Sequence, residues 1–263
     1  MDKAIMNLLS QAQITQKNRN HSVKPCPDQL VGKVEFDPFS RKFTLVDKVT
    51  TKKFAGSKRG DISKSFLPHS PAAMILVLES PHIDEYDDKK EPIGPAYGKT
   101  GEYINCWLGD ILTAATSQKW FTTPTAPTRY DLIVINAIQY QTSLGVDPLI
   151  YRDAMFLRCW ETEKTRRIFK NRVKNILNIY GKQNVILING CTKGEHLNLI
   201  TFHKGGITKK YLSEIGCVFP YKGRLSLKRL VSEELSSISI SQYYVPHPSS
   251  WSKGSNRNLT NHI

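Results

Sequence analysis

Long apolar segments are absent from this sequence of 263 residues. No uninterrupted apolar run approaches the ~20 residues that a membrane-spanning helix needs. The first 18 residues, MDKAIMNLLSQAQITQKN, are too polar for a secretory signal peptide. We therefore expect a cytoplasmic protein that has no membrane as its partner.

Closely spaced cysteines are also absent. The five cysteines are scattered along the chain and form no CxxC pair, which zinc knuckles and thioredoxin-like motifs require. Cys191, His196 and His203 form the one plausible metal-binding group, but their spacing is not that of a usual zinc site and they lie on different predicted elements. We expect buried free thiols, as in a reducing compartment, and we expect no metal and no cofactor.

A complete phosphate-binding loop is missing as well. Residues 94–100 read GPAYGKT, with three residues between the first glycine and Gly-Lys-Thr, whereas the Walker motif has four. The stretch also follows an acidic loop at residues 84–91 and not a strand. This argues against a nucleoside triphosphatase, although a glycine-rich turn that enters a helix can still bind a single phosphate or a base edge.

Positive charge, in contrast, is abundant. The chain has 37 Lys and Arg against 23 Asp and Glu, a net charge of +14, with 40% apolar residues. Such a composition is typical of a globular domain, so the charge lies on a folded body and a polyanion is the expected partner. An anionic membrane surface and a merely solubilising charge are the alternatives. Residues 75–110 run against the trend, with eight acidic and three basic side chains.

Strands and helices are predicted to alternate from about residue 72 onward. Continuous apolar runs predict buried strands, and apolar residues spaced three and four apart predict the helices between them. The predicted strands are 73–79, 131–138, 184–190 and 242–248, and the predicted helices are 102–115, 163–180, 192–199 and 224–236. This pattern predicts an α/β fold, a three-layer α/β/α sandwich with a central four-stranded parallel sheet, over residues 71–263.

Residues 1–70 are predicted to form a basic N-terminal extension. Their basic residues outnumber acidic ones by 13 to 6. A short amphipathic helix is predicted at residues 3–13. The segments VGKVEF and KFTLVD, joined by Asp-Pro-Phe-Ser, predict a β-hairpin. We expect an appended β element or a binding arm.

Polar side chains follow each of the four predicted strands. The strand ends carry Glu79, Asn136, Asn189 and His247. Ligands of open α/β sheets bind at the carboxyl ends of the strands, so a carboxylate, an amide and an imidazole are expected on one rim. A single Asn at a strand end is often a turn cap, and a single His often bonds a backbone carbonyl. A carboxylate, an amide and an imidazole together at successive strand ends favour a functional site.

Five short motifs, in order, resemble the uracil-DNA glycosylase superfamily, most closely its iron–sulfur branch. They are LESPH at 78–82, PAYGKTGEYI at 95–104, IVINAI at 133–138, VILINGCTKGEHL at 185–197 and VPHPSSWS at 245–252. The resemblance spans about residues 72–255. It implies a monofunctional DNA glycosylase that flips a base out of double- or single-stranded DNA, hydrolyses its N-glycosidic bond and leaves an abasic site. We expect the enzyme to be a monomer.

The resemblance also implies roles for individual residues. Glu79 matches the carboxylate that orients water beside the cationic sugar, Asn136 the amide that reads the base edge, and His247 the donor to the departing base. The base pocket is expected to include Ser80, Pro81, His82, Ala96, Tyr97 and Gly98. The DNA contacts are expected from Lys99, Ser249, Ser250, Trp251, Ser252 and Lys253. Trp251 stands where the family has a Leu that wedges into the gap; a core or rim aromatic is the alternative.

Further basic residues are expected to hold the DNA backbone. They lie at residues 164–174, 204–210, 222–229 and 253–257. Such contacts position an enzyme on DNA without reading its sequence. For the run at 164–174, an ordinary solvated helix face is the alternative.

The sequence departs from the family pattern in four ways. The cluster cysteines are absent, which predicts no iron–sulfur cluster. Ala96 stands where the family has a Phe that stacks on uracil, His82 stands where members have Gly or Tyr, and four extra residues lengthen the acidic loop. Together these changes predict a base larger than uracil, namely a bulky modified pyrimidine such as glucosylated 5-hydroxymethylcytosine of phage DNA, with a role in antiviral defence.

Other functions stay open on the sequence alone. They are a uracil-DNA glycosylase in DNA repair, a non-catalytic module that binds modified bases in DNA, and a hydrolase of nucleosides. The net charge of +14 favours polymeric DNA over a nucleoside as the substrate.

Overall fold

The computed structural model describes residues 22, 24–56, 59–62, 65–126, 128–142, 152–192, 226–253 and 257–261. The helix predicted at 3–13, nearly all of the one predicted at 192–199 and the basic stretch at 204–210 lie outside these residues. In the described ranges, no helix is long and apolar enough to cross a membrane.

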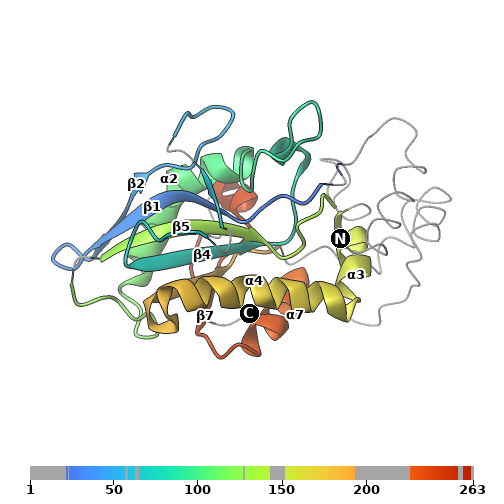
Figure 1. Cartoon of the computed structure of the whole chain (residues 1–263). Helices are drawn as coiled ribbons and strands as arrows, with labels where there is room; N and C mark the ends of the chain where they lie inside the picture. The colour runs from blue at the N-terminus through green and yellow to red at the C-terminus, as the bar shows by residue number, and fades with distance from the viewer. Residues whose placement is uncertain are drawn as a thin grey trace.

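A single mixed sheet of seven strands forms the centre of the described part of the chain (Figure 1). The strands are β1 (Gln29–Asp37), β2 (Lys42–Asp47), β3 (Gly60–Asp61), β4 (Ala72–Leu78), β5 (Thr128–Asn136), β6 (Val185–Asn189) and β7 (Gln242–Tyr244). Their order is β2-β1-β5-β4-β6-β7, and β3 pairs with β1. Strands β5, β4, β6 and β7 pair in parallel, whereas β1 is antiparallel to its neighbours. The predicted α/β class is confirmed, but the sheet is larger than four strands.

The predicted N-terminal hairpin is present as β1 and β2, but it is not an appendage. Strand β1 pairs with β5 from Gln29 opposite Val134 to Phe36 opposite Thr128. Val31 and Val34 of β1 are fully buried in the same hydrophobic cluster as the parallel strands. A boundary near residue 70 therefore does not separate the hairpin from the rest of the fold.

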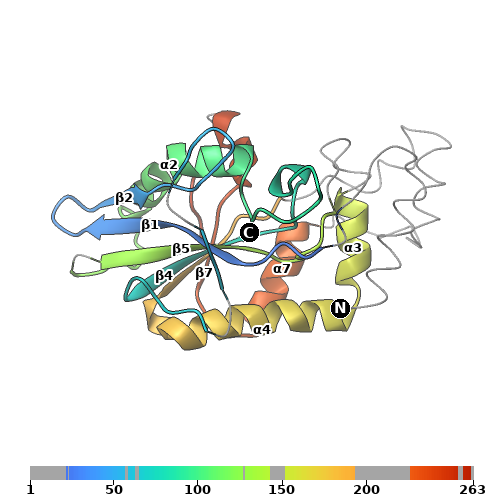
Figure 2. The ribbon, with the colours of Figure 1, turned by 45° about the horizontal axis from the view of Figure 1, so that its top comes forward.

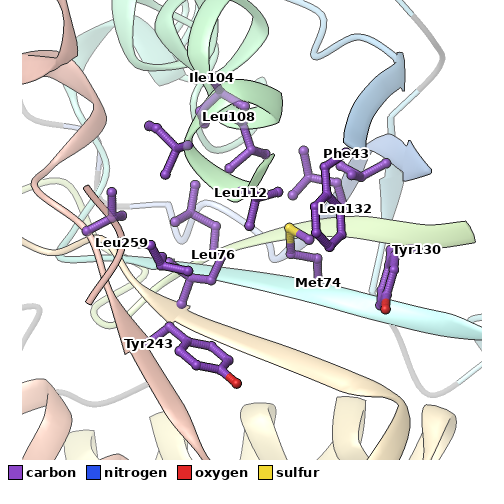
Figure 3. Packing of buried hydrophobic residues seen from close by; sticks show 14 of the residues in the cluster. Phe43, Met74, Leu76, Ile104, Leu108, Leu112, Tyr130, Leu132, Tyr243 and Leu259 are labelled. Atoms are coloured by element: carbon purple, nitrogen blue, oxygen red, sulfur yellow. The ribbon is translucent and has the colours of Figure 1, made fainter. Parts of the chain in front are cut away.

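Helices cover both faces of the sheet (Figures 1 and 2). Helix α2 (Lys99–Ala115) lies on one face, and α4 (Glu163–Tyr180) and α7 (Leu227–Ser236) lie on the other. Along β4, Met74 and Leu76 pack toward α2 (Figure 3), whereas the alternating residues Ala73, Ile75 and Val77 belong to the cluster of α4. Because both faces of β4 are covered, every one of its side chains is buried, as its continuous apolar run predicts.

The element bounds differ modestly from the prediction. Helix α4 covers the predicted residues 163–180, whereas α2 begins three residues earlier, at Lys99. Helix α3 (Ala154–Trp160) was not predicted, because the apolar residues of AMFLRCW show no clear helical period; Met155, Phe156, Leu157, Cys159 and Trp160 are buried. Short 3₁₀ turns η1 (Ile83–Glu85), η3 (Lys182–Asn184) and η5 (Pro248–Lys253) complete the described elements.

The strand order places a crevice at one end of the sheet. From β4 the chain passes to β5 on one side and then to β6 on the other side. Connections that leave neighbouring parallel strands in opposite directions create a crevice at the carboxyl ends of those strands. The crevice therefore lies where β4 reaches Glu79 and where β6 reaches Gly190.

Candidate active site

A cavity of about 220 Å³ lies at the carboxyl ends of the parallel strands. Seven predicted site residues line it: Glu79, Ser80, His82, Gly98, Lys99, His247 and Ser249. Five more line it without having been assigned to the site: Leu78, Asp84, Glu85, Thr100 and Arg152. The segments that follow β4 and β7 thus meet in one cavity, as expected from the sheet.

Glu79 is a buried carboxylate that faces positive and hydrogen-donating groups. Its side chain is buried, and its Oε2 accepts a hydrogen bond of 3.2 Å from the backbone N–H of Thr192. Nη1 of Arg152 lies 3.6 Å from Oε1, and Nε2 of His247 lies 3.6 Å from Oε2. Burial opposes the charged form, but His247, Arg152 and the Thr192 N–H outweigh it and hold the pKa of Glu79 below its usual range. Glu79 is therefore ionised at neutral pH.

His247 is a neutral hydrogen-bond donor beside this carboxylate. Its Nδ1 accepts from the backbone N–H of Ser249 at 3.2 Å and lies 2.7 Å from the Ser249 hydroxyl. A ring nitrogen that accepts an N–H carries no proton, so this bonding pattern assigns the proton to Nε2. Burial lowers the pKa of His247 despite the attraction of Glu79. The imidazole therefore presents an uncharged Nε2–H toward Glu79.

Glu85 is a second buried carboxyl group in the cavity, at 3% exposure. Its Oε1 accepts from the backbone N–H of Ala96 at 2.9 Å, and its Oε2 accepts from Nδ2 of Asn136 at 3.2 Å. Burial is the largest influence and raises the pKa of Glu85 to about 8. At neutral pH this carboxyl group is mainly protonated, unlike Glu79.

Asn136 was expected to read a base edge, and the structure places it next to Glu85 and outside the residues that line the cavity. The residue ends β5, is 1% exposed and donates its side-chain N–H to Glu85. In the described part of the chain, its Oδ1 has no hydrogen-bond partner. Glu85 itself lines the cavity, and Asn136, at the end of the neighbouring strand β5, orients the Glu85 carboxyl group through this hydrogen bond.

Three predicted base-pocket residues also lie outside the cavity lining: Pro81, Ala96 and Tyr97. Ala96 is fully buried and has a φ of 57°, and its N–H bonds to Glu85. Tyr97 lies under the guanidinium of Arg59, 5.6 Å from the ring centre to the Arg carbon. The space that a small residue at position 96 was expected to open is therefore not part of this cavity.

The prediction that Trp251 is a DNA wedge is wrong in this structure. Its side chain has no exposed surface, packs in the cluster between α2 and the sheet, and donates Nε1–H to the carbonyl of Pro246 at 2.7 Å. The alternative, that Trp251 is a core aromatic, agrees with its burial.

Ser250, Ser252 and Lys253 share η5 with Trp251, and none of them lines the cavity. Ser250 donates its hydroxyl to the carbonyl of His247 at 2.7 Å and so fixes the turn.

The acidic loop carries less net charge than its sequence suggests. Asp84 pairs with Lys52 at 2.7 Å, and Glu91 pairs with Lys24. Glu85 points inward and is mainly protonated. An acidic loop repels phosphate groups. Two ion pairs and one neutral carboxyl group make this repulsion weaker than the loop's sequence suggests.

Several basic residues that were expected to hold DNA are engaged inside the fold. On α4, Lys170 lies 2.6 Å from Glu234, and Arg172 pairs with Asp28. Lys228 of α7 is 5% exposed and donates Nζ–H to the carbonyl of Val245. Lys99 is exposed and lines the cavity mouth. Among the described basic residues, Lys99 is thus better placed for a phosphate than the charge run on α4.

Sequence reasoning missed Glu85 and Arg152. Glu85 is one of five acidic residues in its loop, and no local pattern distinguishes the buried one. Arg152 lies far from Glu79 along the chain, and its neighbours form no motif. Their positions depend on how loops return to the sheet, which local sequence does not encode.

The chain was compared with known proteins at three levels. No family model matches it, and neither the curated proteins nor the solved structures gave a match.

Proposed function

We propose that this chain is a DNA glycosylase that hydrolyses the N-glycosidic bond of a flipped base and leaves an abasic site. The observation that carries the proposal is the ionised Glu79, 3.6 Å from the Nε2 of a neutral His247, in a cavity at the strand ends. Cleavage of a glycosidic bond develops positive charge on the sugar and negative charge on the leaving group. A carboxylate beside a neutral donor supplies a partner for each charge.

The roles of the two residues follow from their surroundings. Glu79 orients a water molecule, accepts its proton and stabilises the sugar cation. His247 donates Nε2–H to a carbonyl oxygen of the departing base, and Ser249 keeps the ring in this orientation through Nδ1. Arg152 helps to keep Glu79 ionised.

The rest of the molecule supports a DNA substrate. A net charge of +14 favours a polyanion over a free nucleoside, and Lys99 at the cavity mouth can contact a phosphate. The parallel strands β5, β4, β6 and β7 with helices on both faces are compatible with the three-layer α/β/α architecture that the motif resemblance implies. On this proposal the enzyme acts as a monomer in the cytoplasm.

We propose a bulky modified pyrimidine, such as glucosylated 5-hydroxymethylcytosine in phage DNA, as the base. The support is the acidic side of the cavity, where Asp84 and Glu85 face the ligand space. Carboxyl groups accept hydrogen bonds from amino and hydroxyl groups, which such a base has and uracil largely lacks. Its removal would leave abasic sites in invading DNA, which is a route to antiviral defence.

The experiment incubates the purified chain with three DNAs: duplex with unmodified bases, duplex with uracil, and phage DNA with glucosylated 5-hydroxymethylcytosine. Abasic sites are measured by alkaline strand cleavage, and the released base is identified by mass spectrometry. We expect release from the glucosylated DNA only. Release of uracil alone would indicate a repair enzyme, and tight binding without abasic sites in any DNA would contradict glycosylase activity.

Two variants test the site itself. His247→Ala removes the donor, and Asn136→Ala removes the side chain that orients Glu85. We expect both to lose excision while far-UV circular dichroism remains that of the wild type. Excision at the wild-type rate by both variants would contradict the assigned site.

A further inference from the structure

Two buried carboxyl groups from different elements share the cavity. Glu79 follows β4 and Glu85 ends η1, and each is 3% exposed. Glu79 has Arg152 and His247 within 4 Å. Glu85 forms no ion pair among the described residues and is instead held by three neutral donors, namely the N–H of Ala96, the amide of Asn136 and the thiol of Cys26. The two carboxyl groups therefore sit in opposite electrostatic settings.

We propose that Glu85 is the general acid of the reaction, which delivers its carboxyl proton to N3 of a cytosine-type base while the glycosidic bond breaks. The inference rests on the proposed glycosylase function and deepens it, because it names the ring chemistry of the substrate. It assigns Asn136 as a positioning residue, which acts through Glu85.

A cytosine ring needs this proton more than uracil does. Uracil leaves as an anion whose charge spreads over two carbonyl oxygens, and a donor such as His247 stabilises that charge. Cytosine has a single carbonyl oxygen and an unprotonated N3, so it leaves readily when N3 gains a proton and the departing base is neutral. An acid near the base edge is therefore the group that a cytosine-type substrate requires.

The step balances in atoms and electrons. The bond between C1′ of the sugar and N1 breaks and its electron pair stays with the base. The proton of Glu85 forms the new N3–H bond, so Glu85 becomes a carboxylate and the base leaves uncharged. Water adds to C1′ and gives its proton to Glu79. One water is consumed, and solvent then restores the starting protonation of both carboxyl groups.

The surroundings of Glu85 favour its proton. Desolvation raises its pKa most, the charge of Glu79 raises it further, and the donors Ala96 and Asn136 together with Arg59 lower it. The thiol of Cys26, 4.0 Å from Oε2, adds no positive charge. With a pKa of about 8, Glu85 holds a proton at neutral pH and can donate it. Glu79 has a lowered pKa, is ionised at the same pH and can accept a proton. Two carboxyl groups with opposed shifts in one cavity form an acid–base pair.

The neighbouring ionisable groups of Glu85 hold a constant charge between pH 7 and 9. His82 has a pKa lowered mainly by burial, so it is neutral near pH 7, and Asp84 pairs with Lys52. Tyr86, the next residue along the chain, has a raised pKa and stays uncharged. Between pH 7 and 9, therefore, Glu85 is the cavity carboxyl group whose charge changes.

The test compares Glu85→Gln with the wild type and with Glu91→Gln. Glu91 lies on the same loop but is exposed and pairs with Lys24, which makes it a matched control. Single-turnover excision is measured from pH 5 to 9 on DNA with glucosylated 5-hydroxymethylcytosine. We expect the wild-type rate to fall above about pH 8. We expect Glu85→Gln to lose roughly 10²–10⁴-fold in rate and to lose this alkaline limb. Glu91→Gln is expected to behave as the wild type.

The outcomes separate this inference from the proposed function. If Glu85→Gln excises at the wild-type rate with the same alkaline limb, Glu85 is not the acid although the chain remains a glycosylase. If the wild type makes no abasic sites, the glycosylase proposal itself fails. If Glu85→Gln does not fold, Glu85→Asp replaces it in the experiment, because Asp keeps a carboxyl group. A wild-type excision rate that stays constant between pH 7 and 9 also overturns the inference. Excision of uracil alone also overturns it.

Discussion

Oε2 of Glu79 lies 3.6 Å from Nε2 of His247, and this pair joins the end of β4 to the segment after β7. The carboxylate is ionised and the imidazole is neutral, so the pair is polar without being an ion pair. The space beside the two groups is where the reacting sugar and base are placed in the proposed mechanism.

Replacing Glu79 by Gln tests the carboxylate. Gln keeps the size of the side chain but cannot accept a proton from water or balance a sugar cation. We expect excision to fall by roughly 10²–10⁴-fold, because general-base catalysis contributes about this much. The measurement is the rate of abasic-site formation at saturating enzyme. Affinity for DNA at a fixed salt concentration serves as the control, and a rate like that of the wild type would contradict the role of Glu79.

Replacing Arg152 by Gln tests the electrostatic support of Glu79. Nη1 of Arg152 lies 3.6 Å from Oε1 of Glu79 and lowers the pKa of that carboxyl. Excision requires the carboxylate and is lost as the pH falls through its pKa, so removal of the positive charge should move the acid limb of the pH–rate profile to higher pH. Arg152→Lys keeps the charge and should move this limb less. An unshifted acid limb in Arg152→Gln would contradict this role.

The difference in stability between the wild type and Glu85→Gln should depend on pH. The pKa of Glu85 rises from 4.5 to about 8 on folding, so between these values the folded state holds one proton more than the unfolded state. As the pH rises from 4.5 to about 8, the free energy of unfolding of the wild type therefore falls, relative to that of the Gln variant, by up to about 1.4 kcal/mol per pH unit. Urea unfolding at pH 4.5, 6.5 and 8.5 measures the difference. A constant difference across the three pH values would contradict the raised pKa.

Replacing Trp251 by Ala should destabilise the fold. The indole is fully buried and hydrogen-bonded to Pro246, so we expect a loss of about 3–5 kcal/mol in the free energy of unfolding. Trp251→Phe should lose less, because it keeps most of the apolar volume. Urea unfolding gives both values. A DNA wedge predicts instead that Trp251→Ala unfolds like the wild type and loses only excision.

The parallel core of the fold could be predicted from the sequence, and its outer pairing could not. Strands β4, β5 and β6 are continuous apolar runs because both of their faces are covered, and this makes them visible locally. The hairpin was also visible, but its antiparallel pairing with β5 was not, since the choice of a distant strand leaves no local pattern.

The candidate site divides in the same way. Glu79 and His247 follow strands, so the strand pattern placed them on one rim. Glu85 reaches the cavity from the 3₁₀ turn η1 and Arg152 from the helical turn before α3, and the positions of both turns depend on tertiary contacts. Trp251 shows a further limit, because an aromatic after a strand reads equally well as a DNA contact or as a core residue, and burial decides between them.

The segment before β1 has a consequence for the loop that carries Glu85. The hydroxyl of Tyr86 donates to the carbonyl of Lys24 at 3.1 Å, and that of Ser22 donates to the carbonyl of Lys90 at 2.7 Å. The loop is thus tied down by the fold itself, so on the proposed function the entropic cost of ordering it falls on folding and not on binding DNA. If the proposed function holds, binding energy gained at the strand ends is not used to order this loop, and the segment before β1 contributes to the reaction from outside the cavity.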